Sequence, residues 1–374
     1  MADRVVVATH EVTRTGAPMS LLHLIRWLTT HTDLEIEVIV AEPGEDGGLL
    51  LSDFEAVVPT RVAPELFDLE QPSARLPACD LLYLNSIFAA GCLTHLPTPR
   101  PYIISRVPEL AMAFRQMLET DASGALLAET DRFLAVSDAV RRMLVADQGI
   151  DQGRVAVVHG SIDLAGTVPL SDAEGASRRS ALGVSEGDFV VGGAGTTDWR
   201  KGPDLFVRVA MAVQERLADH SAHFVWIGGE AGGPAFWRAE NRVRAGQVAP
   251  PVHFLGSQPD PLAWFALMDV FALTSREDPF PRVCMEAAAM GTPIVTFDNG
   301  GAPELVAKGC GFVVPYLDVD EMADRVVELL LDAELRRRLG AVGESVIRAE
   351  HTVDTGGPDT LVEIDRGLQI AGAR

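Results

Sequence analysis

The sequence has few cysteines, and their spacing forms no recognisable pattern. The four among its 374 residues are Cys79, Cys92, Cys284 and Cys310. None belongs to a CxxC pair or has the Cys/His spacing of a zinc site. Met1 is followed by a charged segment and not by the basic and apolar segments of a signal peptide. We therefore expect a cytoplasmic protein with reduced thiols.

Long hydrophobic runs and positive charge are also scarce. No apolar stretch approaches the roughly 20 residues that span a bilayer, so we expect no membrane-spanning segment. The 31 Lys and Arg residues are outnumbered by 53 Asp and Glu residues, and the formal net charge at pH 7 is −22. Such a chain repels nucleic acid and anionic lipid. We expect neither as a partner.

Lysine is nearly absent, since only Lys201 and Lys308 occur and every other basic residue is arginine. A lysine retained against this bias indicates a position where a compact ammonium group is useful. Drift would also leave one or two lysines. For Lys201 the two explanations are equally good on composition alone.

Apolar residues make up 47% of the chain, and the length predicts about two domains. Apolar strand-like runs alternate with segments of helical periodicity, a pattern typical of parallel sheets flanked by helices. In the first half we predict helices at 20–30 and 137–147, the second with Ser137 as its N-cap. The predicted strands there are 4–9, 36–41, 81–86, 102–106, 132–137 and 154–160.

The alternation begins again after a joining segment at 164–185. Predicted helices start at 203, 261, 281 and 303, between strands at 189–195, 223–229, 252–257, 270–275 and 293–297. The sequence therefore predicts an α/β protein of two Rossmann-like domains, one over residues 1–165 and the other over residues 166–350.

Two carboxylates, Asp278 and Glu286, follow the predicted strand 270–275. Asp278 lies in the loop, and Glu286 lies on a helix that we expect to begin at Pro281 and to stop at Gly291. Helix N-termini beyond the carboxyl ends of parallel strands bind anions. A carboxylate there repels phosphate but accepts hydrogen bonds from hydroxyl groups. A nucleotide sugar offers both groups, while a loop acid and a solvated helix acid remain the alternative explanation.

Two further loops repeat the arrangement. The glycine turn "DNGGAPELV" at 298–306 follows a predicted strand and opens a helix. The loop "GTTDWRKGP" at 195–203 supplies Arg200 and Lys201. Cations thus come from one loop and acids from another, although the glycine spacing lacks the full dinucleotide fingerprint.

These segments resemble the retaining GT4 glycosyltransferases, whose GT-B fold has two Rossmann-like domains with an interdomain cleft. "DPFPRVCME" at 278–286 is similar to the family's acid, seven residues and Glu. "GGAPELV" resembles its GGxPE segment, "WRKGPDLF" its KG loop, and "FLAVSDAVRRML" with "VVHGSID" its interdomain passage. "HEVTRTGAPMSLLHL" resembles the glycine loop and helix that border the acceptor. The likeness covers most of the chain.

The resemblance implies a role for each matching residue. Asp278 would bind the transferred sugar, Glu286 the ribose hydroxyls and Lys201 the diphosphate, and these three would form the catalytic centre. Further donor-side residues would be Gly16, Arg200, Gly256, Phe280, Pro281, Arg282 and Val283. On the acceptor side it suggests His10, Arg106 and Glu109; a plain loop histidine and a structural ion pair are the alternatives. His95 is expected to be structural.

The chain departs from the family at Gly195-Thr196, where Gly-Arg is usual. The arginine that helps to neutralise the diphosphate is missing there, and Arg200 beside Lys201 could replace it. The family's first acid, usually Glu, is Asp278 here, one methylene shorter.

The resemblance implies a metal-independent enzyme without a cofactor that moves a sugar from a nucleotide-diphosphate sugar to a hydroxyl of a small molecule or glycan. The acceptor would attack on the face that the diphosphate leaves, and a donor phosphate oxygen would take the proton. Domain closure would exclude water. The sequence offers no His/Cys cluster for a metal. Residues 351–374 would pack back on the N-terminal domain.

Other functions of the same fold stay open. They are an epimerase or hydrolase of nucleotide sugars, a pseudo-glycosyltransferase that joins non-sugar rings, and a non-catalytic nucleotide-sugar sensor, which only Thr196 favours. The sequence does not identify the acceptor. A net charge of −22 favours a cationic small molecule such as an aminocyclitol, although surface acids also serve solubility.

Overall fold

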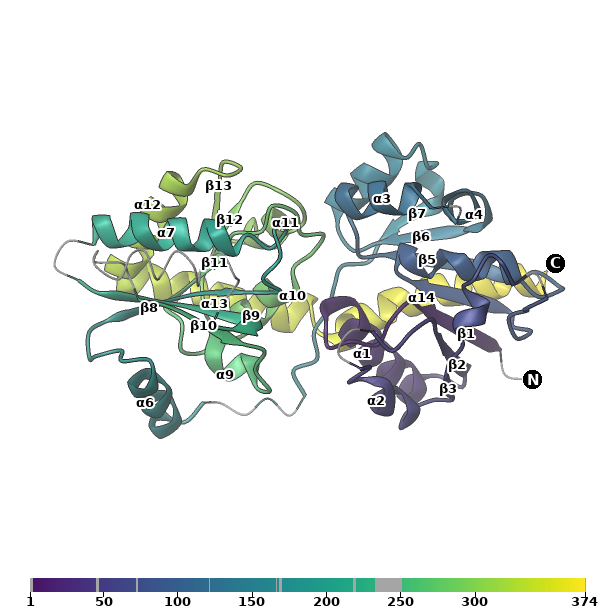
Figure 1. The fold of residues 1–374 in the computed structure, drawn as a ribbon, viewed down its shortest axis with the longest axis horizontal. Coiled ribbons are helices and arrows are strands. Elements are labelled where there is room, and N and C mark those ends of the chain that lie inside the picture. Colours follow the sequence, from purple (N-terminus) through teal and green to yellow (C-terminus); the bar gives the residue numbers. More distant parts are fainter. Residues whose placement is uncertain are drawn as a thin grey trace. The chain divides into compact units, whose positions relative to one another are not determined.

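The structure is a computed structural model that describes residues 3–44, 47–71, 73–120, 122–165, 167, 170–217, 220–232 and 251–373. The chain divides into an N-terminal unit, Met1–Asp163 with His351–Arg374, and a C-terminal unit, Leu164–Glu350. Each unit is a parallel sheet with helices on both faces (Figure 1). The first segment of the N-terminal unit ends at Asp163, two residues before the predicted boundary at 165.

The N-terminal sheet has the strand order β3-β2-β1-β4-β5-β6-β7, and neighbouring strands are parallel. The order reverses between β1 and β4, and open α/β sheets bind ligands at the carboxyl ends of strands at such a switch point. The strands are β1 Arg4–Thr9, β2 Glu35–Val40, β3 Thr60–Val62, β4 Leu81–Asn85, β5 Tyr102–Val107, β6 Arg132–Ala135 and β7 Val155–Val157.

Helices cover both faces of this sheet. On one face, α1 and α14 pack against β4 and β5 and share a core with them (Figure 1). The approach of α14 is close, since a Cβ at Gly357 would meet the ring of Trp27 and one at Gly367 would meet Tyr102. The helices of this unit are α1 Gly16–His31, α2 Leu51–Glu55, α3 Ala111–Leu118, α4 Ser123–Glu129, α5 Asp138–Arg142 and α14 Val353–Gly372, with a 3-10 segment at Ile87–His95.

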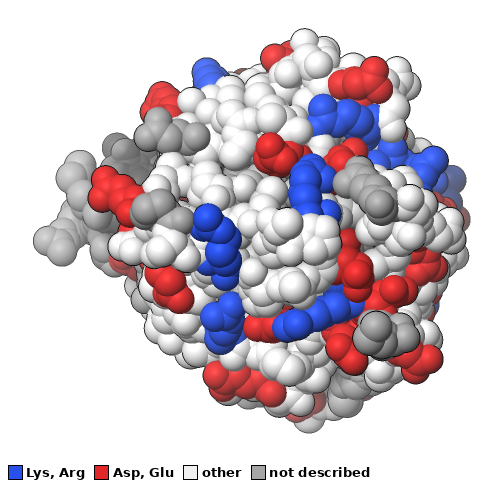
Figure 2. All heavy atoms as spheres, turned by 90° about the vertical axis from the view of Figure 1, so that its right-hand side faces the viewer, with Lys and Arg blue, Asp and Glu red and all other residues white. Residues whose placement is uncertain are grey.

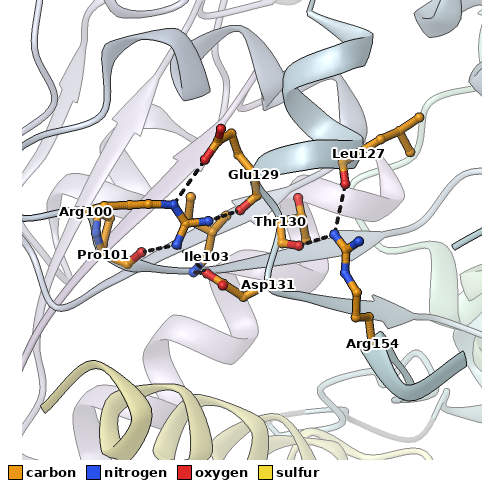
Figure 3. Close-up of polar contacts among 8 residues, drawn as sticks. All are labelled: Arg100, Pro101, Ile103, Leu127, Glu129, Thr130, Asp131 and Arg154. Carbon is orange, nitrogen blue, oxygen red and sulfur yellow. Dashed lines mark hydrogen bonds and ion pairs between the residues drawn. The ribbon is translucent and has the colours of Figure 1, made fainter. Parts of the chain in front are cut away.

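Arginine side chains form hydrogen bonds between the segments that precede β5, β6 and β7 (Figure 3). Arg100 donates to the Asp131 carboxylate at 2.8 Å and to the Glu129 carboxylate at 3.1 Å. Arg154 donates to the carbonyl oxygens of Leu127, at 2.9 Å, and Thr130. These bonds satisfy carbonyls at the end of α4. They lie at the edge opposite the carboxyl ends, so we assign them to stability.

Charges of both signs alternate on the face of the molecule drawn in Figure 2. Among the described residues, Arg4 and Arg61 both pair with Glu37, and Arg132 pairs with Glu363.

None of the described helices is both long enough and apolar enough to cross a membrane.

The C-terminal sheet has the order β10-β9-β8-β11-β12-β13, with its switch point between β8 and β11. Helices α7 and α12 pack on one face and share a core with the sheet, and α9, α10 and α13 lie on the other (Figure 1). The strands are β8 Phe189–Ala194, β9 Ala222–Ala231, β10 Val252–Gly256, β11 Val270–Leu273, β12 Ile294–Phe297 and β13 Gly311–Val314. The helices are α6 Asp172–Ala181, α7 Pro203–Arg216, α9 Pro261–Phe265, α10 Arg282–Ala289, α11 Ala302–Val306, α12 Val319–Leu331 and α13 Ala333–Glu350.

Local signals in the sequence located most boundaries. Ser137 caps α5 by accepting from the Val140 N–H at 3.1 Å, as predicted. The predicted helix start at Pro281 was wrong by one residue, because Pro281 has extended backbone angles and is the N-cap, so α10 begins at Arg282. The expected helix at 137–147 divides into α5 and a π-helical turn, Met143–Asp147.

Candidate active site

The switch point of the C-terminal sheet brings two predicted site residues into contact. Lys201 follows β8 and Asp278 follows β11, and these strands are neighbours. Nζ of Lys201 donates to Oδ2 of Asp278 at 2.6 Å. Only 5% of Asp278 is exposed. A buried carboxylate requires a partner of opposite charge, and the ammonium of Lys201 supplies it.

Glycines let the backbones of the three loops approach one another. Gly300 has a φ of +67°, and a Cβ there would collide with the carbonyl oxygen of Asp278. The Gly301 N–H donates to that same oxygen at 3.0 Å. Gly202, with a φ of +69°, lies equally close to the Thr274 carbonyl. The turn at 298–301 therefore fixes the loop that carries Asp278.

Glu286 lies one turn into α10, where it pairs with the first residue of the same helix. Nε of Arg282 donates to Oε1 of Glu286 at 2.7 Å. Glu286 is 8% exposed and belongs to the buried face of α10. Cys284 is also buried on this helix; burial, followed by the charge of Asp278, raises the pKa of its thiol well above the ordinary value. Burial of this kind favours the neutral thiol over the nucleophilic thiolate.

Arg200 and Lys201 both direct their side chains toward the 277–278 loop, although they are consecutive residues. Nη1 of Arg200 donates to the Glu277 carbonyl at 3.2 Å. Residues 199–201 form a turn and not a strand, which removes the alternation of a strand. Thr196, at the position of the missing family arginine, donates its hydroxyl to the carboxylate of Asp198.

Sequence reasoning missed Arg276, which joins the loops after β8 and β11. Its guanidinium donates to Asp204 with two nitrogens and to the Trp199 carbonyl at 2.8 Å. The Asp204 hydrogen bond is the main cause that raises the pKa of Arg276. The exposed ring of Trp199 lies 4.7 Å from this guanidinium. No local pattern marked Arg276, because its partners are far away in sequence.

Gly256 ends β10 with a φ of +71°, and a Cβ there would meet the backbone of Ala231 at 2.9 Å. The close packing of β10 against β9 thus explains why residue 256 is a glycine. Phe280 and Pro281 complete the turn before α10, and Val283 follows Arg282 on the helix.

The four other predicted residues belong to the N-terminal unit. Gly16 is the first residue of α1, and a Cβ at this position would meet no other atom within 4 Å. His10 follows β1, one of the two strands at the switch point, whereas Arg106 lies near the carboxyl end of β5, the strand beside β4, and Glu109 follows it. Nη1 of Arg106 donates to Oδ1 of Asn85 at 3.2 Å, and the ring of His10 lies 3.4 Å from Glu11.

Glu109 is buried beside a strained residue. Its Oε2 accepts from the Ile87 N–H at 3.4 Å. Ser86, whose hydroxyl also bonds Glu109, has a φ of +104° without being a glycine. Burial raises the pKa of Glu109 to about 7, against the opposing effects of Ser86 and the positive neighbours. Strained backbone of this kind accumulates at functional sites.

The described contacts bear on the expected role of His95 and on metal binding. His95 is 1% exposed and its Nε2 lies 2.9 Å from the Asp68 carbonyl, as expected of a structural histidine. Across the described residues, no three His, Cys, Asp or Glu side chains are grouped to hold a metal ion.

Residues 188–332 match the family model described as glycosyl transferases group 1. The D-inositol 3-phosphate glycosyltransferase of Jonesia denitrificans is 34% identical over 66% of this chain and 55% of its own length. The protein of the same name from Mycolicibacterium gilvum is 30% identical over 78% of this chain and 62% of its own. This chain therefore spans little more than half the length of these relatives.

Solved structures are similar over nearly the whole chain. HepE of Anabaena, in complex with UDP and glucose, has a TM-score of 0.80 at 19% identity and covers 97% of this chain and 99% of its own. WaaG, a glycosyltransferase involved in lipopolysaccharide biosynthesis, has a TM-score of 0.68 at 13% identity, covering 95% and 98%. At these identities the likeness shows the GT-B fold.

Proposed function

The chain belongs to the GT4 family of glycosyltransferases, and from this we propose that it is a retaining enzyme that uses a nucleotide-diphosphate sugar as donor. One observation supports the proposal above others. A buried acid–lysine pair, Asp278 with Lys201, lies at the switch point of the C-terminal sheet, and a second buried acid, Glu286, lies on the helix that follows.

The proposed chemistry assigns each charge to one part of the donor. Lys201 neutralises the diphosphate as the bond from C1 of the sugar to the phosphate oxygen breaks and its electron pair leaves with the phosphate. Asp278 accepts hydrogen bonds from the sugar, and Glu286 accepts them from the ribose. The acceptor oxygen bonds to C1 on the same face, and its proton passes to a donor phosphate oxygen.

We propose that the reaction needs no metal ion, because side-chain cations supply the positive charge. Lys201 and Arg200 both reach the loop that carries Asp278. A chelator such as EDTA should then leave turnover unchanged. Restoration of lost activity by a divalent cation would contradict this part of the proposal.

The acceptor is proposed to bind at the carboxyl edge of the N-terminal sheet. Glu11 and Glu109 both lie close to His10 there, while Arg106 bonds to Asn85. Two acids at this edge favour a cationic or neutral acceptor, such as an aminocyclitol, over a phosphorylated one. The curated relatives are named for D-inositol 3-phosphate, so that compound is the appropriate comparison.

A donor and acceptor panel tests the proposal. UDP- and GDP-sugars are incubated with the protein, and release of nucleoside diphosphate is followed with and without an aminocyclitol, inositol 3-phosphate or a glycan. Acceptor-dependent release and an α-linked product from an α-linked donor would support a retaining transferase. Release without any acceptor would favour a hydrolase, and binding without turnover would favour a sensor.

A further inference from the structure

Four of the five charged side chains of the proposed donor site neutralise one another in pairs. Lys201 pairs with Asp278 at 2.6 Å, and Arg282 pairs with Glu286 at 2.7 Å. The four side chains are between 6% and 17% exposed. These two acids and two cations sum to zero charge, which leaves Arg200, bonded to the Glu277 carbonyl, as the one further cation of the site. A diphosphate carries more than one negative charge, so we expect the ion pairs to open, at least in part, when a nucleotide binds.

Arg282 retains hydrogen-bonding capacity that its contacts do not use. A guanidinium has five N–H donors, and its Nε is bonded to Glu286. Its Nη1 is buried and, within the described part of the chain, has no hydrogen-bond partner. An unsatisfied buried donor costs free energy unless a ligand oxygen accepts from it. Arg282 is thus suited to an oxygen-rich anion.

We propose that Arg282 exchanges partners when the nucleotide binds. Its guanidinium leaves the Glu286 carboxylate and binds the diphosphate, and Glu286 then accepts the ribose hydroxyls. This inference rests on the proposed function, because it assumes a nucleoside diphosphate at this site. It assigns a specific side-chain role to a residue that the resemblance places on the donor side without a role of its own.

The exchange also supplies positive charge that the loop after β8 lacks. Thr196 replaces the family's arginine, and its hydroxyl is bonded to Asp198. Arg282 approaches from the opposite loop, as the first residue of α10, whose free N–H groups also favour an anion. The planar guanidinium can bind two phosphate oxygens at once.

A simpler role for Arg282 would be to orient Glu286. Comparing nucleoside binding with nucleoside diphosphate binding distinguishes this orienting role from partner exchange. Arg282→Gln removes the charge and releases Glu286. Partner exchange predicts at least tenfold weaker binding of UDP or GDP, whichever the wild type prefers. Binding of the matching nucleoside, which has ribose and no phosphate, should be unchanged or tighter. An orienting role predicts equal losses for both ligands.

The measurement is isothermal calorimetry for the diphosphate and competition for the nucleoside. Arg348→Gln is the matched control, because Arg348 forms a comparable pair within α13, 3.0 Å from Glu344, and its loss should change neither affinity. Arg282→Lys, which keeps the charge without the planar fork, should bind the diphosphate with intermediate affinity and guards against a folding defect in Arg282→Gln.

Equal losses for nucleoside and diphosphate, or no loss for either, would overturn the exchange while the proposed function stands. Failure of the wild-type protein to bind UDP, GDP or any nucleotide sugar would instead overturn the proposed function, and the exchange with it. The two failures are distinguished by the wild-type titration alone.

Discussion

Replacing Asp278 with Asn separates binding of the sugar from binding of the nucleotide. The carboxylate is buried and its Oδ2 lies 2.6 Å from Nζ of Lys201. If it also accepts from the sugar, Asp278→Asn loses a hydrogen bond to a charged group, about 1.5–3 kcal/mol. That loss corresponds to a decrease in kcat/KM of roughly 10- to 150-fold for the whole donor.

The nucleoside diphosphate lacks the transferred sugar, so its affinity should behave differently. In the wild type Lys201 must loosen its bond to Asp278 before it binds phosphate. The neutral Asn competes less for the ammonium, so we expect diphosphate affinity that is unchanged or up to about tenfold higher. Calorimetry with UDP and GDP, beside steady-state kinetics with the intact donor, measures both effects.

Asp324→Asn is the control, because Asp324 pairs with Arg216 at 2.7 Å on an exposed helix face and should alter neither quantity. Urea unfolding would show how much stability Asp278→Asn loses through the unpaired ammonium, which we expect to be about 1–3 kcal/mol. A parallel loss of diphosphate affinity in a folded variant would refute the assignment of Asp278 to the sugar.

Three further predictions concern Glu286, Arg200 and Glu109. Glu286→Gln should weaken binding of the nucleoside, which has no phosphate for a released Arg282 to bind, by about 1–3 kcal/mol, and unchanged nucleoside affinity would refute a ribose contact. Arg200→Ala should lower kcat/KM tenfold or more, and adding Thr196→Arg should restore part of the lost activity. If Arg200→Ala keeps wild-type kinetics while Lys201→Ala is inactive, Arg200 takes no part in binding the diphosphate. The pKa of Glu109 is raised from its usual 4.5 to about 7, so the folded state binds more protons than the unfolded state between these values and stability falls as pH rises through that window. Between pH 5 and 8 the free energy of unfolding should fall by up to about 3 kcal/mol less in Glu109→Gln than in the wild type. Urea unfolding measures this difference, and an identical pH dependence in both proteins would contradict the raised pKa of Glu109.

The elements that the sequence predicted are those with strong local signals. Apolar runs located β1, β8 and β11, and a serine before a helical segment located the start of α5. Two short strands, β3 and β13, were missed. Both depend on pairing with β2 and β12, respectively, which is a property of the sheet and not of the segment.

The sequence by itself determined which residues carry charge at the ends of strands, because strand periodicity, helix caps and glycine turns are local and can be read in order along the chain. Together with the family resemblance of these loops, it indicated Lys201, Asp278 and Glu286 as a set. Only the tertiary structure decided their partners. The crossovers of the C-terminal sheet place β8 beside β11, so that Lys201 reaches across 77 residues to Asp278, whereas the helix repeat brings Arg282 to Glu286 on a single turn. Coulomb attraction between buried groups depends on distance in space, and that distance was set by the order of strands in the sheet.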